Sequence, residues 1–395
     1  MHHPILYLIT LFIFSCSTPQ EQSKEQQEAP VEIKPGAWQM NEYLPLLRGK
    51  RVGLCVNQSS TVAQTHLLDT LLALGVDVPK TVGIGIPKVF TPEHGFKGTA
   101  DAGEHVSSDQ SNEYAIISLF GNKRQPTDED VSGLDVIVFD LQDVGIRFYT
   151  YISTMHYLME VAAKNDIPFV ILDRPNPNGS YVDGPFLKKS QRSFVGLHPI
   201  PIVHGLTIGE LAHMINEEGW LKDGLKVDLT VIPIQNWDHS TRYSLPVKPS
   251  PNLPNGMSIA LYPSLCLFEG TIASVGRGTD APFQHIGHPY YPDRTYSFVP
   301  SPREGAKSPK YDGQACYGMD FRTDKVGYSF TIDPLIDFYN KMGKPDDFFT
   351  PYFKLLAGDL DEQIVAGMTS DEIRASWQVE LDKFKTMREQ YLIYK

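Results

Sequence analysis

The residues most suited to chemistry gather in one short stretch, Glu93 to His105. Three carboxylates and two histidines lie within these thirteen residues, together with three glycines. The stretch follows an apolar run, residues 82–90, that predicts a buried strand. Glycines let a backbone bend closely around a ligand, and open α/β sheets bind ligands beyond the carboxyl ends of their strands. We therefore predict an active-site loop, the alternative being a surface loop whose charges are solvated.

Carboxyl groups are the sequence's best candidates for acid–base chemistry. Hydrolysis of a glycosidic bond needs one carboxyl group as proton donor and usually a second group as base or nucleophile. Four carboxyl groups follow predicted strands or apolar runs and could converge on one cleft: Glu93, Glu104, Asp143 and Glu269. A serine hydrolase is not supported, because the chain has no Gly-x-Ser-x-Gly motif.

The sequence lacks the motifs of the common cofactors. It holds twelve histidines, but no His-x-x-x-His pair and no His-Glu-x-x-His signature. No Gly-x-Gly-x-x-Gly motif follows the first predicted strand, residues 51–56, where Asn57-Gln58-Ser59 stands instead. We therefore expect neither a catalytic metal nor a dinucleotide cofactor.

Alternating strands and helices are predicted to position the candidate residues. Apolar runs predict strands at residues 51–56, 82–90, 114–120, 136–140, 168–172 and 227–234, and helical patterns cover residues 67–75, 151–164, 334–342 and 370–394. A capping box, Thr207 with Glu210, predicts one more helix start. Near-continuous apolar strands are typical of a parallel sheet covered on both faces. Right-handed crossovers would bring the loops that begin at Asn57, Thr91, Gln142 and Asp173 to one edge of a Rossmann-like, doubly wound sheet.

Length and composition are those of a globular protein of about two domains. The chain has 395 residues, 41% hydrophobic and 21% charged. Its net charge is −12 without a basic block, so we expect no nucleic-acid partner. Four prolines between residues 246 and 254 indicate a domain boundary, a crossing segment or a ligand loop. Cys55, Cys266 and Cys316 match no metal spacing and are interpreted as buried thiols.

The N-terminus predicts the compartment. The apolar run of residues 5–14 is too short to span a bilayer. It ends at Ile13-Phe14-Ser15-Cys16, which resembles a bacterial lipobox with Cys16 as the lipidated residue; the alternative is an ordinary signal peptide with an incidental cysteine. Residues 17–35 are polar and predict a flexible tether. We expect a lipid-anchored protein of the cell envelope, either periplasmic or on an outer membrane.

Several long motifs together resemble the NamZ-type exo-β-N-acetylmuramidases. The similarity runs from about residue 36 to the C-terminus, with the motifs in the family's order. The matching stretches are Phe90-Thr91-Pro92-Glu93-His94-Gly95, residues 139–151 (Phe-Asp-Leu-Gln-Asp-Val-Gly-Ile-Arg-Phe-Tyr-Thr-Tyr), Leu172-Asp173-Arg174-Pro175-Asn176-Pro177, Glu269-Gly270-Thr271 and Ser274-Val275-Gly276-Arg277-Gly278-Thr279.

The resemblance implies a peptidoglycan-recycling glycosidase that removes N-acetylmuramic acid from the non-reducing end of muropeptides and disaccharides. It also implies a Rossmann-like catalytic domain, residues 36–245, and a smaller C-terminal α+β domain, residues 246–395, with the active site in the cleft between them. Glu93 would be the general acid, with Glu104 or Glu269 as its partner. No cofactor is implied.

The lactyl carboxylate of N-acetylmuramic acid calls for a cation in the site. Arg147, Arg174 and Arg277 stand in loops of the predicted active edge; alternatively, they are structural partners of Asp143, Asp173 and Asp280. Tyr149 and Tyr151 could stack on the sugar, or pack as the first turn of a helix. The further candidates for substrate binding are Asn57, His94, Gln142, Asp143, Asp173, Asn176 and His204.

Two other functions stay open on the sequence. One is an amidase or esterase that acts on cell-wall sugars through the Glu93–His94 loop. The other is a lipoprotein that binds muropeptides without cleaving them. Within the glycosidase hypothesis, a nucleophilic Glu and attack by the substrate's own 2-acetamido group are equally open.

Overall fold

The computed structural model describes residues 31–75, 88–101, 115–121, 123–323 and 329–395. Residues 33–395 form one compact unit. Four sequence predictions lie outside the described residues: the lipobox at Cys16, most of the tether, residues 82–87 of the second strand, and Glu104 with His105. In the part of the chain that is described, no helix is long and apolar enough to cross a membrane.

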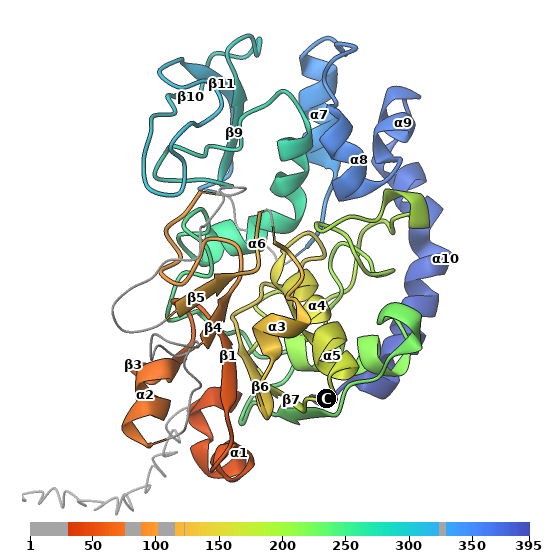
Figure 1. Ribbon diagram of the computed structural model, residues 1–395. Coiled ribbons are helices and arrows are strands. Elements are labelled where there is room, and N and C mark those ends of the chain that lie inside the picture. The colour runs from red at the N-terminus through yellow and green to blue at the C-terminus, as the bar shows by residue number, and fades with distance from the viewer. Residues whose placement is uncertain (1–30, 76–87, 102–114, 122, 324–328) are drawn as a thin grey trace, which may run out of the picture. The chain divides into compact units, whose positions relative to one another are not determined.

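A six-stranded parallel sheet forms the centre of the N-terminal part (Figure 1). Its order is β5-β4-β1-β6-β7-β8, which is 3-2-1-4-5-6 when these strands are counted along the chain. This is the order of a Rossmann-type doubly wound sheet, as predicted. The strands are β1 (Val52–Val56), β4 (Lys88–Thr91), β5 (Ala115–Ser118), β6 (Val136–Asp140), β7 (Phe169–Leu172) and β8 (Leu229–Ile232); β2 (Thr61–Val62) and β3 (Thr65–His66) form a separate hairpin.

Helices cover both faces of the sheet, which explains the continuous apolar runs. In β1, Val52, Leu54 and Val56 belong to the hydrophobic cluster that includes α1 (Met40–Leu47) and α2 (Leu67–Ala73). Cys55 belongs to the cluster on the other face, with α4 (Tyr151–Lys164) and α5 (Ile208–Glu217). Side chains of a strand alternate between the faces, so every position of β1 is buried.

Most of the predicted elements are confirmed. The helix at residues 151–164 is α4, and the predicted capping box of Thr207 and Glu210 starts α5. The last helix, α10 (Ser370–Arg388), is shorter than predicted, because a 3-10 turn, η5 (Glu389–Tyr391), and an extended end follow it. The other helical segments are η1 (Gly36–Trp38), α3 (Asp128–Val131), η2 (Lys189–Gln191), η3 (Lys222–Gly224), α6 (Gly256–Leu265), η4 (Cys266–Gly270), α7 (Asp333–Lys341), α8 (Pro351–Ala357) and α9 (Leu360–Val365).

The C-terminal part combines helices with a small antiparallel sheet, so its α+β class is as predicted. The sheet order is β10-β11-β9, with β9 at His285–His288, β10 at Ser297–Phe298 and β11 at Cys316–Asp320. The chain end returns to the parallel sheet, where the Tyr394 hydroxyl donates a hydrogen bond to Asp173 Oδ2 at 2.7 Å. The division of the chain at residue 246 stays a prediction.

Candidate active site

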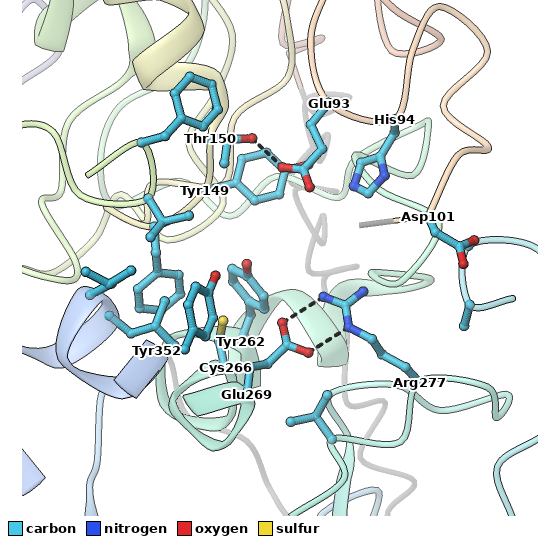
Figure 2. Close-up of a pocket in the computed structure, with 18 of the residues that line it drawn as sticks. Glu93, His94, Asp101, Tyr149, Thr150, Tyr262, Cys266, Glu269, Arg277 and Tyr352 are labelled. Atoms are coloured by element: carbon cyan, nitrogen blue, oxygen red, sulfur yellow. Dashed lines mark hydrogen bonds and ion pairs between the residues drawn. The ribbon is translucent and has the colours of Figure 1, made fainter. Parts of the chain in front are cut away.

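A cavity of about 580 Å³ lies at the carboxyl edge of the parallel sheet. Figure 2 shows Glu93 and His94 on one wall, and Glu269 with Arg277 on the wall opposite. The first wall comes from the loops that follow β4 and β6. The second comes from α6, η4, α8 and the loops of residues 273–277 and 305–310. The sheet therefore supplies one half of the site and the C-terminal part the other.

Glu93 is held at the end of β4 by the start of α4. The Thr150 hydroxyl, at the N-cap of that helix, donates a hydrogen bond to Glu93 Oε2 at 2.7 Å. The next residue, His94, has a φ of 71°, which is the left-handed region that non-glycine residues avoid. Such strain persists where surrounding contacts impose it, and functional sites are enriched in it. The turn fixes Glu93 so that its side chain enters the cavity (Figure 2).

His94 connects this loop to the proline-rich segment. Its Nδ1 lies 2.7 Å from the Ala100 carbonyl oxygen, so Nδ1 carries a proton and donates it to that hydrogen bond. Its Nε2 then accepts from the Ser250 hydroxyl at 3.2 Å. Burial lowers the pKa of His94, although the neighbouring Glu93 opposes this shift. His94 is thus a neutral imidazole that positions the Glu93 loop.

Glu269 and Arg277 form a bidentate ion pair on the opposite wall. Arg277 Nε donates to Glu269 Oε1 at 2.7 Å, and Arg277 Nη2 donates to Oε2 at 2.9 Å (Figure 2). Burial opposes ionisation of Glu269, but the Arg277 charge and hydrogen bonds outweigh it and lower the pKa of Glu269. Glu269 is therefore a carboxylate at neutral pH.

Glycines on both sides of Arg277 set its direction. Gly276 and Gly278 have φ of 77° and 82°. A Cβ on Gly276 would lie 2.2 Å from His285 Nε2, so a side chain is excluded there. The backbone conformation thus explains why glycines stand on both sides of Arg277 in this motif.

Aromatic side chains line the cavity, but mostly as packed groups. Tyr149 and Tyr151 are 6% and 1% exposed, and both hydroxyls donate to the Pro249 carbonyl oxygen. Their rings pack edge to face, with centroids 4.7 Å apart. Tyr149 and Tyr151 are therefore mainly packed side chains, which was the alternative to stacking on the sugar, although their rings contribute to the cavity wall. Tyr352, which the sequence analysis did not single out, is 40% exposed and lines the cavity from α8.

Four other predicted site residues lie in a buried polar layer outside the cavity lining. Asn57 Nδ2 donates to the Tyr151 hydroxyl at 2.9 Å, and Gln142 Nε2 donates to the Pro175 carbonyl oxygen at 2.8 Å. The remaining two are Asn176, which donates to the Leu206 carbonyl oxygen, and Asp143, which accepts from the Gly145 N–H. Burial raises the pKa of Asp143 to about 7. These residues support the loops of the site from behind.

Arg147 and Arg174 also lie outside the cavity lining. The Arg147 guanidinium is fully buried and donates to the carbonyl oxygens of Pro185, Ile200 and Leu356. Burial lowers its pKa to about 9, so it remains charged at neutral pH. Arg174 forms a buried ion pair with Asp140.

The predicted partners of the three arginines are wrong. Asp143 and Asp173 accept hydrogen bonds mainly from backbone N–H groups and hydroxyls, and Asp280 pairs with Arg303. Neighbours in sequence after a strand point in different directions, so chain proximity does not choose ion-pair partners.

The buried hydrogen bonds of Asp173 and His204 also indicate structural roles. Asp173 accepts from the hydroxyls of Thr207 and Tyr394 and from the Gly209 N–H, and burial raises its pKa to about 6. His204 is 1% exposed and accepts at Nδ1 from the Leu206 N–H. Burial lowers its pKa to about 3. Neither residue is part of the cavity lining.

Of the residues predicted for the site, the cavity brings together Glu93, His94, Tyr149, Tyr151, Glu269 and Arg277. Sequence reasoning missed Thr150, Tyr262, Lys310 and Tyr352. Thr150 stands inside a motif that had been singled out, so its hydroxyl was a readable signal. Lys310 and Tyr352 come from segments without a recognisable pattern. Among the described residues, no three His, Cys, Asp or Glu side chains gather as a metal site.

The comparisons with known proteins cover both halves of the chain. Residues 52–257 match the family model for the N-terminal part of the exo-β-N-acetylmuramidase NamZ, and residues 260–394 match the model for its C-terminal part. The peptidoglycan β-N-acetylmuramidase NamZ of Bacillus subtilis (strain 168) is 36% identical over 424 residues, covering 98% of each chain.

Two crystal structures of DUF1343 family proteins from Bacteroides fragilis NCTC 9343 have a similar fold. One is 42% identical with a TM-score of 0.84, and the other is 26% identical with a TM-score of 0.77. Each comparison covers 92% of this chain and 99% of the other.

Proposed function

This chain belongs to the family of the exo-β-N-acetylmuramidase NamZ, and we propose that it hydrolyses the glycosidic bond of non-reducing terminal N-acetylmuramic acid in peptidoglycan fragments, with Glu93 as general acid. It is a glycoside hydrolase. The observation that carries the proposal is the pair of carboxyl groups, Glu93 and Glu269, on opposite walls of one cavity.

The two carboxyl groups have different surroundings, which supports different roles. Glu269 is held as a carboxylate by Arg277 and cannot donate a proton at neutral pH. One oxygen of Glu93 accepts a hydrogen bond from the Thr150 hydroxyl, which orients the carboxyl group in the cavity. Glu93 gives its proton to the glycosidic oxygen as the bond to the anomeric carbon breaks. Water then supplies the new hydroxyl group on that carbon, and its other proton restores Glu93. Glu269, held as a carboxylate, is the second carboxyl group that hydrolysis of a glycosidic bond usually needs.

The test uses the full-length chain in detergent and two nitrophenyl glycosides, of N-acetylmuramic acid and of N-acetylglucosamine. We expect nitrophenol release from the muraminide. Removal of an acyl or peptide group from muropeptides, without release of free N-acetylmuramic acid, would instead indicate the amidase or esterase. Tight binding of muropeptides without any hydrolysis would indicate a binding protein.

We also propose that Cys16 carries a lipid anchor, on the basis of the sequence Ile13-Phe14-Ser15-Cys16. In bacteria fed labelled palmitate, the wild-type chain is expected to take up the label and to sediment with membranes. Cys16→Ser should lose the label completely. A wild-type chain that is cleaved and released without label would show an ordinary signal peptide.

A further inference from the structure

A lysine that no sequence motif indicated lines the cavity next to the ion pair. The Lys310 ammonium donates hydrogen bonds to the carbonyl oxygens of Thr271 and Ala273, at 2.7 and 3.1 Å. These two bonds use two of its three N–H donors. The side chain is exposed and belongs to the cavity lining, so the ammonium is fixed in place and can be reached from the cavity.

Arg277 also has an N–H donor that no described residue accepts. Its Nε and Nη2 donate to Glu269. Its Nη1 is buried and has no hydrogen-bond partner among the described residues. A buried donor without a partner costs free energy, and binding sites contain such donors because a ligand satisfies them. Figure 2 shows the guanidinium beside the Glu269 carboxylate, at the edge of the cavity.

The charges on this wall do not cancel. Arg277 donates to both Glu269 oxygens, and Lys310 is bonded to the carbonyl oxygens of Thr271 and Ala273, in the segment that follows Glu269. Burial opposes ionisation of Glu269, but both cations lower its pKa. One carboxylate neutralises one of the two cations. Together, Glu269, Arg277 and Lys310 therefore carry one surplus positive charge, which would favour an anionic group of a ligand at this point of the cavity.

We propose that Lys310 and Arg277 Nη1 form an anion subsite that binds the lactyl carboxylate of the terminal sugar. This inference rests on the proposed function, because the lactyl carboxylate is the one charged group of a terminal N-acetylmuramic acid that carries no peptide, and N-acetylglucosamine lacks it. Lys310 is the residue that determines specificity between the two sugars. The sequence offered Arg147, Arg174 and Arg277 as the cation for this carboxylate, and of these three only Arg277 lines the cavity.

Lys310 gives a cleaner test than Arg277, because replacing Arg277 would also leave Glu269 without its partner. In Lys310→Met the apolar stem stays and the charge is lost. We expect kcat/KM for the nitrophenyl muraminide to fall about 10- to 100-fold, the contribution of a charge-assisted hydrogen bond, mainly through KM. The value for the glucosaminide should stay within about twofold, because that sugar has no carboxylate for the subsite. Lys310→Arg keeps the charge and should retain most of the preference.

Lys307→Met is the matched control, since Lys307 is in the same loop and outside the cavity lining. It should leave the ratio of the two sugars unchanged. If Lys310 only holds the loop of Thr271 and Ala273, Lys310→Met lowers both activities equally, and the proposal is wrong. A wild-type chain that cleaves both sugars equally well would also overturn it.

Failure of the proposed function is distinguishable from failure of the subsite. If the wild-type chain hydrolyses neither sugar, the glycosidase proposal falls, and calorimetric titration with the free sugars decides the subsite. Tighter binding of N-acetylmuramic acid than of N-acetylglucosamine, lost in Lys310→Met, supports the subsite. Equal affinity of the wild-type chain for both sugars excludes it.

Discussion

Glu93→Gln is expected to lower kcat/KM for hydrolysis of the disaccharide N-acetylmuramyl-N-acetylglucosamine by about 10²- to 10⁴-fold. The sugar that leaves is a poor leaving group without a proton on its oxygen, and Gln has no proton of this acidity to give. The amide oxygen of Gln can still accept the hydrogen bond from Thr150, so the turn at His94 should persist. Release of N-acetylmuramic acid, followed by chromatography, measures the effect.

The leaving group provides the internal control. Nitrophenolate leaves readily without protonation, so Glu93→Gln should impair the nitrophenyl muraminide much less than the disaccharide. An equal loss on both substrates would contradict the role of proton donor and indicate that Glu93 acts on the sugar itself. A thermal melting curve like that of the wild type is required for either conclusion.

Arg174→Met is expected to lower the free energy of unfolding by about 3–5 kcal/mol, because it leaves the Asp140 carboxylate buried without a cation. Asp140 is 0% exposed and Arg174 is 4% exposed. Two guanidinium nitrogens, Nε and Nη2, donate to the two carboxylate oxygens. The pair lies where β6 ends, beneath the loops of the site. Urea unfolding of the variant and the wild type measures the difference.

Two comparison variants distinguish the effect of burial on stability from the effect of ion pairing itself. Arg51→Met breaks an ion pair with Asp135 whose side chains are 52% and 33% exposed. It should cost only about 0–1 kcal/mol, because water already solvates both partners. The double variant Asp140→Leu with Arg174→Met removes both buried charges and should recover most of the stability that Arg174→Met loses.

This measurement also decides between the two roles that the sequence left open for Arg174. A structural partner predicts lost stability and an unchanged ratio of muraminide to glucosaminide hydrolysis in the folded fraction. A variant of full stability that no longer distinguishes the two sugars would return Arg174 to the substrate site.

The sequence by itself determined the elements and the edge of the sheet where the site lies. Each of these follows from local rules: the continuous apolar run of β1, the helical repeat of Leu67, Leu68 and Leu71, and the capping box at Thr207. Since all strands of the large sheet are parallel, the loop that carries Glu93 had to lie at the carboxyl edge. The motif around Glu93, together with the four others that resemble the NamZ family, indicated the family from the sequence alone.

Only the tertiary structure decided which side chains meet. The helix α6 escaped prediction because it is buried on most of its surface, so its sequence has no polar face to show a helical period. The partner of Arg174 was Asp140, on the neighbouring strand, and the partner of Arg277 was Glu269, at the end of a helix eight residues before it. Lys310 reached the site from a loop without a pattern. Side-chain contacts depend on how segments distant in the chain pack against each other, and packing of that kind leaves no local signature in the sequence.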